Sequence, residues 1–234
     1  MRLYSLLLAA LALCFVTNSR CHAQQYGSFG IVQTYNGTVA FAPQALNLAV
    51  NGQMLVMNKY SDVVDGTPYL FDEWQPGAII LYNNVVVENL RLKLNLLDNE
   101  LYYKDSSGAE LSAVTPVKYI VFKHVGNDTS AIFMAQQSVE FDRKGWFQVL
   151  ATGKASLLKE RTKKLIESKQ YASATLDRSI TTDVRYYVLR QGKLHLVKTV
   201  ADVLAVLPEA AAGQKKNVKN EVDMKAVVDA FNRL

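Results

Sequence analysis

The stretch Leu90-Arg91-Leu92-Lys93-Leu94-Asn95-Leu96 decides the expected fold, because leucine alternates with charged or polar residues at every second position. A period of two is that of a β-strand, in which successive side chains point to opposite faces. One face would then be buried and the other solvated, which is typical of antiparallel sheets.

Turn signals surround this strand and predict a meander. Asn83-Asn84 precedes it, Asp98-Asn99 follows it, and Gln191-Gly192 separates two later apolar runs. Asn and Gly tolerate the positive φ angles of two-residue hairpin turns. We therefore expect an α+β protein built on a curved antiparallel sheet of roughly eight to ten strands, either open or a partial barrel.

The C-terminal region is predicted to be helical. Val200–Leu207 is apolar and stops at Pro208, Glu209–Asn220 is rich in Ala and Lys, and Glu221–Leu234 has apolar residues at helical spacing. Two or three helices would cover an edge or opening of the sheet. Residues 155–161 can be read as a strand or as part of a helix, and the preceding Gly153 favours the strand.

The first 23 residues have the pattern of a secretory signal peptide. Arg2 precedes an apolar run, and Cys21-His22-Ala23 forms a cleavage site before Gln24. The run is shorter than the roughly 20 residues of a spanning helix, so no transmembrane span is expected after cleavage. The protein would be exported to the periplasm or the exterior. Residues 24–60 would form a poorly defined segment, 61–198 the β domain, and 199–234 the helices packed on it.

Composition narrows the classes of function. Both cysteines, Cys14 and Cys21, lie in the predicted leader, so the exported chain would have no disulfide, thiolate nucleophile or cysteine metal site. Loss of Arg2 and Arg20 would lower the net charge from +5 to +3. A nucleic-acid partner is not expected from so weak a charge, and no cofactor motif is present.

Two segments carry a resemblance to a known group of proteins. Gly66–Gly77 reads GTPYLFDEWQPG, and the chain ends in Phe231-Asn232-Arg233-Leu234. These segments resemble uncharacterised exported β-meander proteins of Bacteroidota-type bacteria, which share a GTPxLxDEWxxG segment and a helical C-terminal tail. The resemblance implies an exported sheet domain, and it implies no activity, ligand or catalytic residue.

Tyr69, Phe71 and Trp74 are the candidate ligand- or partner-binding residues. Aromatic side chains beside the carboxylates of Asp72 and Glu73 could stack on sugars or on partner side chains. The alternative is that this segment closes one end of the sheet, with Trp74 in the core, and the sequence favours this structural role. The sequence also has two basic clusters, which are expected to be solvated, although each could meet an anionic lipid headgroup or an acidic protein. The first comprises Lys159, Arg161, Lys163 and Lys164, and the second comprises Lys215, Lys216 and Lys219.

No catalytic or metal-binding residue is predicted. Ser156-Leu157-Leu158-Lys159 matches the S-x-x-K pattern of serine acyl enzymes, but its companion motifs are absent. His195 lies between two leucines and should point to solvent if those leucines are buried. Carboxylate pairs such as Asp98/Glu100 and Glu140/Asp142 could hold a proton or a hard cation, but acidic residues are common at turns.

The sequence therefore favours a non-enzymatic envelope protein that binds an unidentified partner or ligand. A second hypothesis is a carrier that encloses an apolar molecule between sheet and helices. The third is a hydrolase that uses His124 or His195, which requires one of them to lie within hydrogen-bond reach of a serine and a carboxylate.

Overall fold

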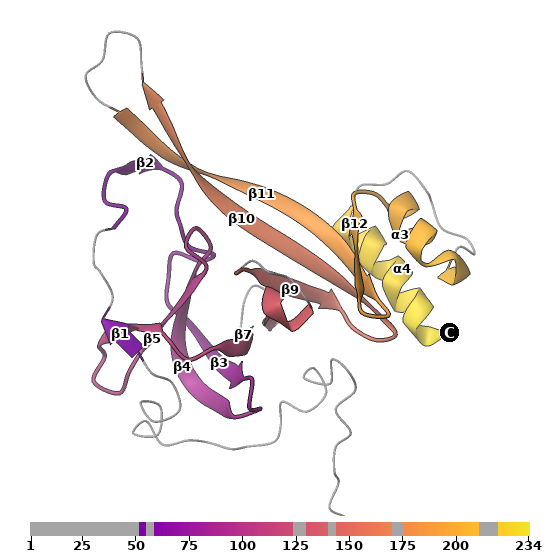
Figure 1. Ribbon diagram of the computed structural model, residues 1–234, viewed down its shortest axis with the longest axis horizontal. Coiled ribbons are helices and arrows are strands. Elements are labelled where there is room, and N and C mark those ends of the chain that lie inside the picture. The colour runs from indigo at the N-terminus through magenta and orange to yellow at the C-terminus, as the bar shows by residue number, and fades with distance from the viewer. Residues whose placement is uncertain (1–51, 55–58, 124–129, 140–143, 170–175, 211–219) are drawn as a thin grey trace, which may run out of the picture. The chain divides into compact units, whose positions relative to one another are not determined.

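A computed structural model describes residues 52–54, 59–123, 130–139, 144–169, 176–210 and 220–234. In these ranges the chain forms one large, mostly antiparallel sheet followed by two α-helices (Figure 1). The predicted signal peptide and nearly all of the predicted segment 24–60 lie outside the described residues. Within the described part of the chain, no helix is long and apolar enough to cross a membrane.

Twelve strands of the described ranges make up the sheet. In chain order they are β1 (Gly52–Met54), β2 (Val63–Asp65), β3 (Gln75–Leu81), β4 (Val86–Asn95), β5 (Glu100–Lys104), β6 (Glu110–Ala113), β7 (Val117–Phe122), β8 (Ala131–Ala135), β9 (Trp146–Ala151), β10 (Ala155–Lys169), β11 (Leu176–Arg190) and β12 (Lys193–Val197).

The strand order makes this an open sheet rather than a partial barrel. It runs β1-β6-β5-β4-β3-β7-β8-β9-β10-β11-β12, and β2 pairs with β11 in parallel. The antiparallel meander is confirmed, whereas eight to ten strands was too few. The strands β1 and β2 have only three residues each and carry no clear alternation, so the sequence did not fix their positions.

The predicted turns are confirmed where the structure describes them. Asn84 and Asn99 have φ angles of 63° and 60°, and the Gln191-Gly192 pair has φ angles of 50° and 75°. Such left-handed residues match the right-handed twist of the flanking strands and permit a tight reversal. The sequence Gly126-Asn127-Asp128 also indicates a turn, but these residues lie outside the description.

Residues 90–95 of the leucine stretch form the second half of β4, and its leucines are buried as predicted. Leu90, Leu92, Leu94 and Leu96 are between 0% and 5% exposed, whereas Arg91 is exposed and Lys93 half-buried. Asn95 breaks the pattern because it is fully buried. Its side-chain amide donates to Asp98 and to the Tyr102 hydroxyl, and its oxygen accepts from two backbone N–H groups.

A hairpin of two 15-residue strands, β10 and β11, forms the longest element of the sheet (Figure 1). This confirms the strand interpretation of residues 155–161 over the helical one. β10 pairs with β9 only as far as Glu160, so the rest of the β10–β11 hairpin continues beyond β9. The length of β10 was not evident from the sequence because charged residues occupy most of positions 159–169.

One face of the sheet carries two apolar clusters separated by polar residues. Paired residues form a continuous row across this face, in the order Ile79, Ile120, Phe133, Gln148, Lys159, Tyr186 and Val197. One apolar cluster, which we call the meander cluster, contains Ile79, Ile120 and Phe133. The other, which we call the helix cluster, contains Val197 and the buried side chains of α3 and α4. The polar middle of the row therefore lies between the two apolar clusters.

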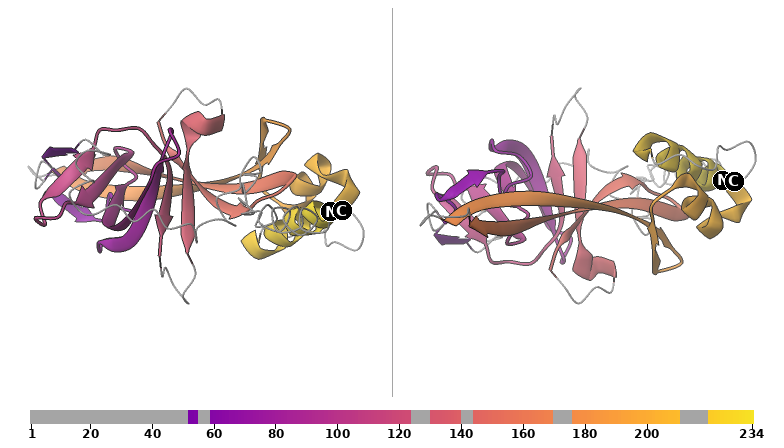
Figure 2. Two further views of the ribbon diagram at one scale, coloured as in Figure 1. Left: turned by 90° about the horizontal axis from the view of Figure 1, so that it is seen from below. Right: turned by 90° about the horizontal axis from the view of Figure 1, so that it is seen from above.

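The helices α3 (Val200–Val206) and α4 (Glu221–Arg233) pack against the β9–β12 end of the sheet (Figure 2). Met224, Val227, Val228 and Phe231 of α4 are buried against Leu157 and Val188, which fills this interface with apolar side chains. The side chain of Thr199 caps α3, and that of Asn220 caps α4. Of the predicted middle helix, the structure describes a short 3-10 turn, Pro208–Ala210, and residues 211–219 lie outside the description.

Candidate functional site

The three predicted aromatic residues do not form one site. Tyr69 and Trp74 flank Lys93, whose Nζ lies 4.0 Å and 5.9 Å from their ring centroids, and Lys104 lies 4.8 Å from Trp74. Both rings are half-buried and serve as platforms for lysines. Phe71 instead packs against the meander cluster. The prediction that Trp74 fills the core is therefore wrong. Trp74 is half-buried outside the meander cluster and makes cation–π contacts with Lys93 and Lys104.

The backbone around Tyr69 is fixed to the leucine strand. The Leu70 N–H donates to Leu94 O at 2.8 Å, and the Leu96 N–H donates to Pro68 O at 2.9 Å. These two bonds form an isolated antiparallel bridge between Tyr69 and Asn95. The segment Thr67–Phe71 is therefore held as a wall above the sheet rather than as a free loop.

A cavity of about 300 Å³ lies beside this wall, and we call it the basic cleft. It is lined by Leu70, Phe71, Leu96, Ala131, Phe133, Gln148, Arg161, Lys163 and Thr182. The lining comes from the Thr67–Phe71 wall, β8, β9, β10 and β11, and the end of the leucine stretch. Its volume is at the lower end of the range of small-molecule sites.

Two half-buried cations, Arg161 and Lys163, stand side by side in the basic cleft on one face of β10. Burial lowers the pKa of Arg161, and burial also lowers the pKa of Lys163 although the charge of Asp72 opposes this. The Arg161 guanidinium donates to Gln148 Oε1 at 2.6 Å, and Lys163 Nζ donates to Thr67 O at 2.5 Å. Among the described residues, neither cation is recorded in an ion pair with a carboxylate. Desolvated cations with unused donors are suited to receiving an anion.

Apart from Gln148 and Thr182, the rest of the basic cleft is apolar. The ring of Phe71 meets Phe122 edge to face at 5.5 Å between centroids, and Phe122 meets Phe133 at 5.7 Å in the same way. Such T-shaped pairs fix the rings relative to one another. A ligand in the cleft would therefore meet two cations on β10 and mostly aromatic and aliphatic side chains elsewhere.

A neighbouring ion pair joins β10 to the start of α4. Lys159 forms a salt bridge with Glu221, and the Tyr186 hydroxyl donates to Glu221 at 2.8 Å. Burial alone would raise the pKa of Glu221, but the hydrogen bonds from Lys159 and Tyr186 outweigh burial and hold the pKa below its usual value. Burial and the bond to Glu221 raise the pKa of Tyr186 to about 12, so this hydroxyl stays protonated at neutral pH.

We expect the Glu221→Gln variant to lose stability in a pH-dependent way. A carboxylate whose pKa is lowered by folding stabilises the protein above its unfolded pKa, near 4.5, and this stabilisation disappears as the pH falls through the folded pKa. Urea unfolding at pH 7 should therefore show a loss of about 0.5–1 kcal/mol, because the pair is partly exposed. At pH 3 the two proteins should differ much less.

The matched control is Asp229→Asn, which removes a half-buried i,i+4 partner of Lys225 on the same helix. It should cost about 0.5 kcal/mol or less. A Glu221→Gln effect that is equally large at pH 3 would show that the interaction does not depend on the ionised carboxylate.

The S-x-x-K match lies in a strand and cannot place its two residues together. Ser156 and Lys159 are on opposite faces of β10, where Ser156 is fully buried and Lys159 binds Glu221. On the Ser156 face, Glu160 is also buried and accepts hydrogen bonds from Gln136 at 2.7 Å and Tyr187 at 2.9 Å. The strand geometry therefore does not place Lys159 one helical turn after Ser156, as the S-x-x-K motif requires.

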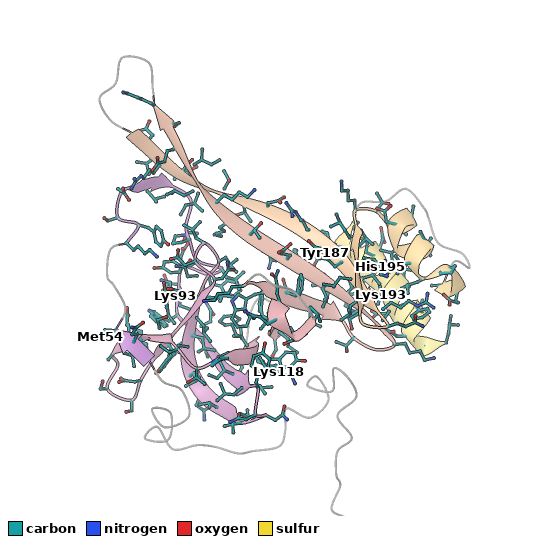
Figure 3. The ribbon with its side chains drawn as sticks, in the orientation of Figure 1. Met54, Lys93, Lys118, Tyr187, Lys193 and His195 are labelled. Carbon is teal, nitrogen blue, oxygen red and sulfur yellow. The ribbon has the colours of Figure 1, made fainter. Side chains whose placement is uncertain are left out.

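His195 lies on β12 (Figure 3). The strand alternates in the opposite sense to the expected one. Its pairing with Val188 places it on the sheet face that the helices cover, where it is half-buried. Leu196 points the other way and is 53% exposed. Within the described residues, no hydrogen bond joins His195 to a serine or a carboxylate. His124 lies outside the described residues.

The predicted carboxylate pairs do not form a metal site where they are described. Asp98 accepts hydrogen bonds from Lys59, Tyr60 and Asn95. Burial opposes its ionisation, but the bonds from Lys59 and Tyr60 hold its pKa below the usual value. Glu100 is exposed and accepts from the Tyr102 hydroxyl. Among the described residues, no three His, Cys, Asp or Glu side chains are grouped to hold a metal ion. Glu140 and Asp142 lie outside the description.

Sequence reasoning placed the basic residues of β10 in solvent, whereas Lys159, Arg161 and Lys163 are half-buried. The usable signal was their spacing, because three cations at every second position share one face of a strand. Lys164, on the other face, is exposed as predicted, and Lys215, Lys216 and Lys219 lie outside the described residues.

No family model, curated protein or solved structure matches this chain. The resemblance to exported β-meander proteins therefore stays a prediction, and any function must be argued from the basic cleft itself.

Proposed function

We propose that this protein is a binding module for a small amphipathic anion, with the basic cleft as its binding site. The observation that carries the proposal is the position of Arg161 and Lys163, two half-buried cations beside apolar walls. A carboxylate or phosphate head would pair with the cations, and a short apolar tail would contact Phe71 and Phe133. If the predicted signal peptide is cleaved, this binding takes place outside the cytoplasm.

The electrostatics favour an anionic ligand over a neutral one. An Arg guanidinium has five N–H donors and a Lys ammonium three, and the described contacts use one donor of each. A charged acceptor forms hydrogen bonds roughly twice as strong as a neutral acceptor does. The partial burial of both cations also reduces screening by water, which strengthens the attraction.

The proposal modifies the carrier hypothesis from the sequence. The interface between the sheet and the helices is filled by apolar side chains of α3 and α4, and the basic cleft lies at the Thr67–Phe71 wall instead. Its apolar part, formed by Leu70, Phe71 and Phe133, can hold a short tail, whereas the cations require a charged head.

We expect the purified protein to bind octanoate, and isothermal titration calorimetry measures this directly. Arg161→Gln should weaken octanoate binding roughly 10- to 100-fold, the range for loss of one hydrogen bond to a charged group. Phe71→Ala should also weaken it, because it removes apolar contact with the tail.

Three controls separate the parts of this proposal. Lys164→Gln changes an exposed cation on the opposite face of β10 and should leave the affinity unchanged. Octanol lacks the charge and inorganic phosphate lacks the tail, so both should bind more weakly than octanoate. Octanol binding as tightly as octanoate, or an unchanged affinity in Arg161→Gln, would contradict the assignment of the basic cleft.

A further inference from the structure

A second, larger cavity lies away from the basic cleft, and we call it the polar groove. Its volume is about 580 Å³, within the range of small-molecule sites. It lies where the start of β5, the end of β6, the start of β7, the start of β9 and the 3-10 turn Gln136–Val139 come together. It shares no lining residue with the basic cleft.

The chemistry of its lining differs sharply from that of the basic cleft. Most of its polar side chains are uncharged amides and hydroxyls, namely Gln53, Asn99, Gln137, Ser112 and Thr115. Each of these groups can both donate and accept hydrogen bonds. The two charged members, Glu100 and Lys144, are of opposite sign, so the formal charge of the lining is balanced.

Two aromatic side chains complete the groove. Tyr82 is 43% exposed and therefore offers ring surface to a ligand, whereas Trp146 is 9% exposed and belongs to the meander cluster. The Tyr82 hydroxyl is hydrogen-bonded to Ser138 at 3.3 Å, and Glu100 accepts from Tyr102 at 2.9 Å. These bonds orient groups of the groove before any ligand arrives, which reduces the entropy lost on binding.

We infer that the polar groove binds an uncharged oligosaccharide. A sugar presents many hydroxyl groups that both donate and accept, and its C–H faces pack on aromatic rings. Amides and hydroxyls with balanced charge, beside an exposed tyrosine ring, match both properties. A strongly anionic ligand would find only one cation, Lys144, in this lining, and a purely apolar ligand would form no hydrogen bonds with its amides and hydroxyls.

Intrinsic tryptophan fluorescence tests the inference without a label. The chain has two tryptophans, so the Trp74→Phe variant keeps Trp146, which lines the groove, as its single reporter. Maltohexaose, cellohexaose and chitohexaose serve as uncharged probes, with an oligogalacturonate as the anionic comparison. At least one uncharged probe should give a saturable fluorescence change at millimolar concentration or below.

Variants of exposed groove residues connect the signal to the site. In the Trp74→Phe background, Tyr82→Ala and Gln137→Ala should each weaken binding roughly 10-fold, the consequence of losing about 1.4 kcal/mol. Tyr82→Phe keeps the ring and should retain most of the affinity. Lys118→Ala, on β7 but outside the groove lining, and Arg161→Gln in the basic cleft should have no effect.

The inference is overturned if no uncharged probe changes the fluorescence, if the oligogalacturonate binds more tightly than all of them, or if Tyr82→Ala binds normally. Because the polar groove and the basic cleft share no residue, its failure would leave the octanoate experiment unaffected.

Discussion

Replacing Leu92 with alanine should lower the free energy of unfolding by about 2–5 kcal/mol, the range for deleting a fully buried leucine side chain. Leu92 is 0% exposed and lies in the meander cluster on the strand that pairs with both β3 and β5. Its Cδ1 atom lies 2.8 Å from where a Cβ atom on Gly77 would be, so the packing around it is close. Urea unfolding followed by circular dichroism gives the value.

The matched control for Leu92→Ala is Arg91→Ala, one residue earlier on the exposed face of β4. It should change the free energy of unfolding by about 0.5 kcal/mol or less. Similar effects of the two substitutions would contradict the assignment of the leucines to the buried face, and with it the register of the meander.

Asn232→Ala should be the most destabilising substitution of a polar residue on α4, at about 2–4 kcal/mol. Asn232 Oδ1 accepts from the Ala155 N–H at 2.9 Å, and Nδ2 donates to Ala155 O at 2.9 Å and to Thr152 O at 3.2 Å. The substitution removes three hydrogen bonds and leaves their backbone partners unsatisfied, at about 1–3 kcal/mol for each buried group left without a partner. Some of these groups will reach water, so the losses are less than additive.

The neighbouring glycine explains why this contact is close. A Cβ atom on Gly153 would lie 2.4 Å from Asn232 Cγ, so the β9–β10 turn and the end of α4 fit only without a side chain there. Thermal unfolding of Asn232→Ala should show the loss, and Arg233→Ala, whose side chain is exposed, should leave the melting temperature nearly unchanged. If both variants behave alike, Asn232 does not hold α4 to the sheet.

The meander was accessible from sequence because its signals are local. Alternating leucines in β4 and the Asn or Gly residues at turns depend on neighbours within a few positions, and short antiparallel connections then fix which strands pair. The same reasoning placed the helix of residues 221–234, whose apolar spacing alone indicates its buried face.

The basic cleft could not be predicted from the sequence in the same way. Arg161 is far in sequence from Phe71 and Leu96, and the three meet only because β10 passes the Thr67–Phe71 wall. Charged side chains on a long hairpin normally indicate solvent, so their burial depends on tertiary packing. His195 shows the same limit, because the alternation of β12 was clear whereas the face that α3 and α4 cover was not.

The β10–β11 hairpin carries both the basic cleft and the contacts with the helices, and this arrangement affects how the protein can partly unfold. Because α3 and α4 rest on the β9–β12 end, their detachment would expose the helix cluster while the ladder of β3, β4 and β7 persists. Local opening of this kind requires less free energy than global unfolding. Lys159, which binds Glu221 of α4, lies on the same strand as Arg161. An anion in the basic cleft that holds β10 in place would therefore also make the detachment of α3 and α4 less frequent.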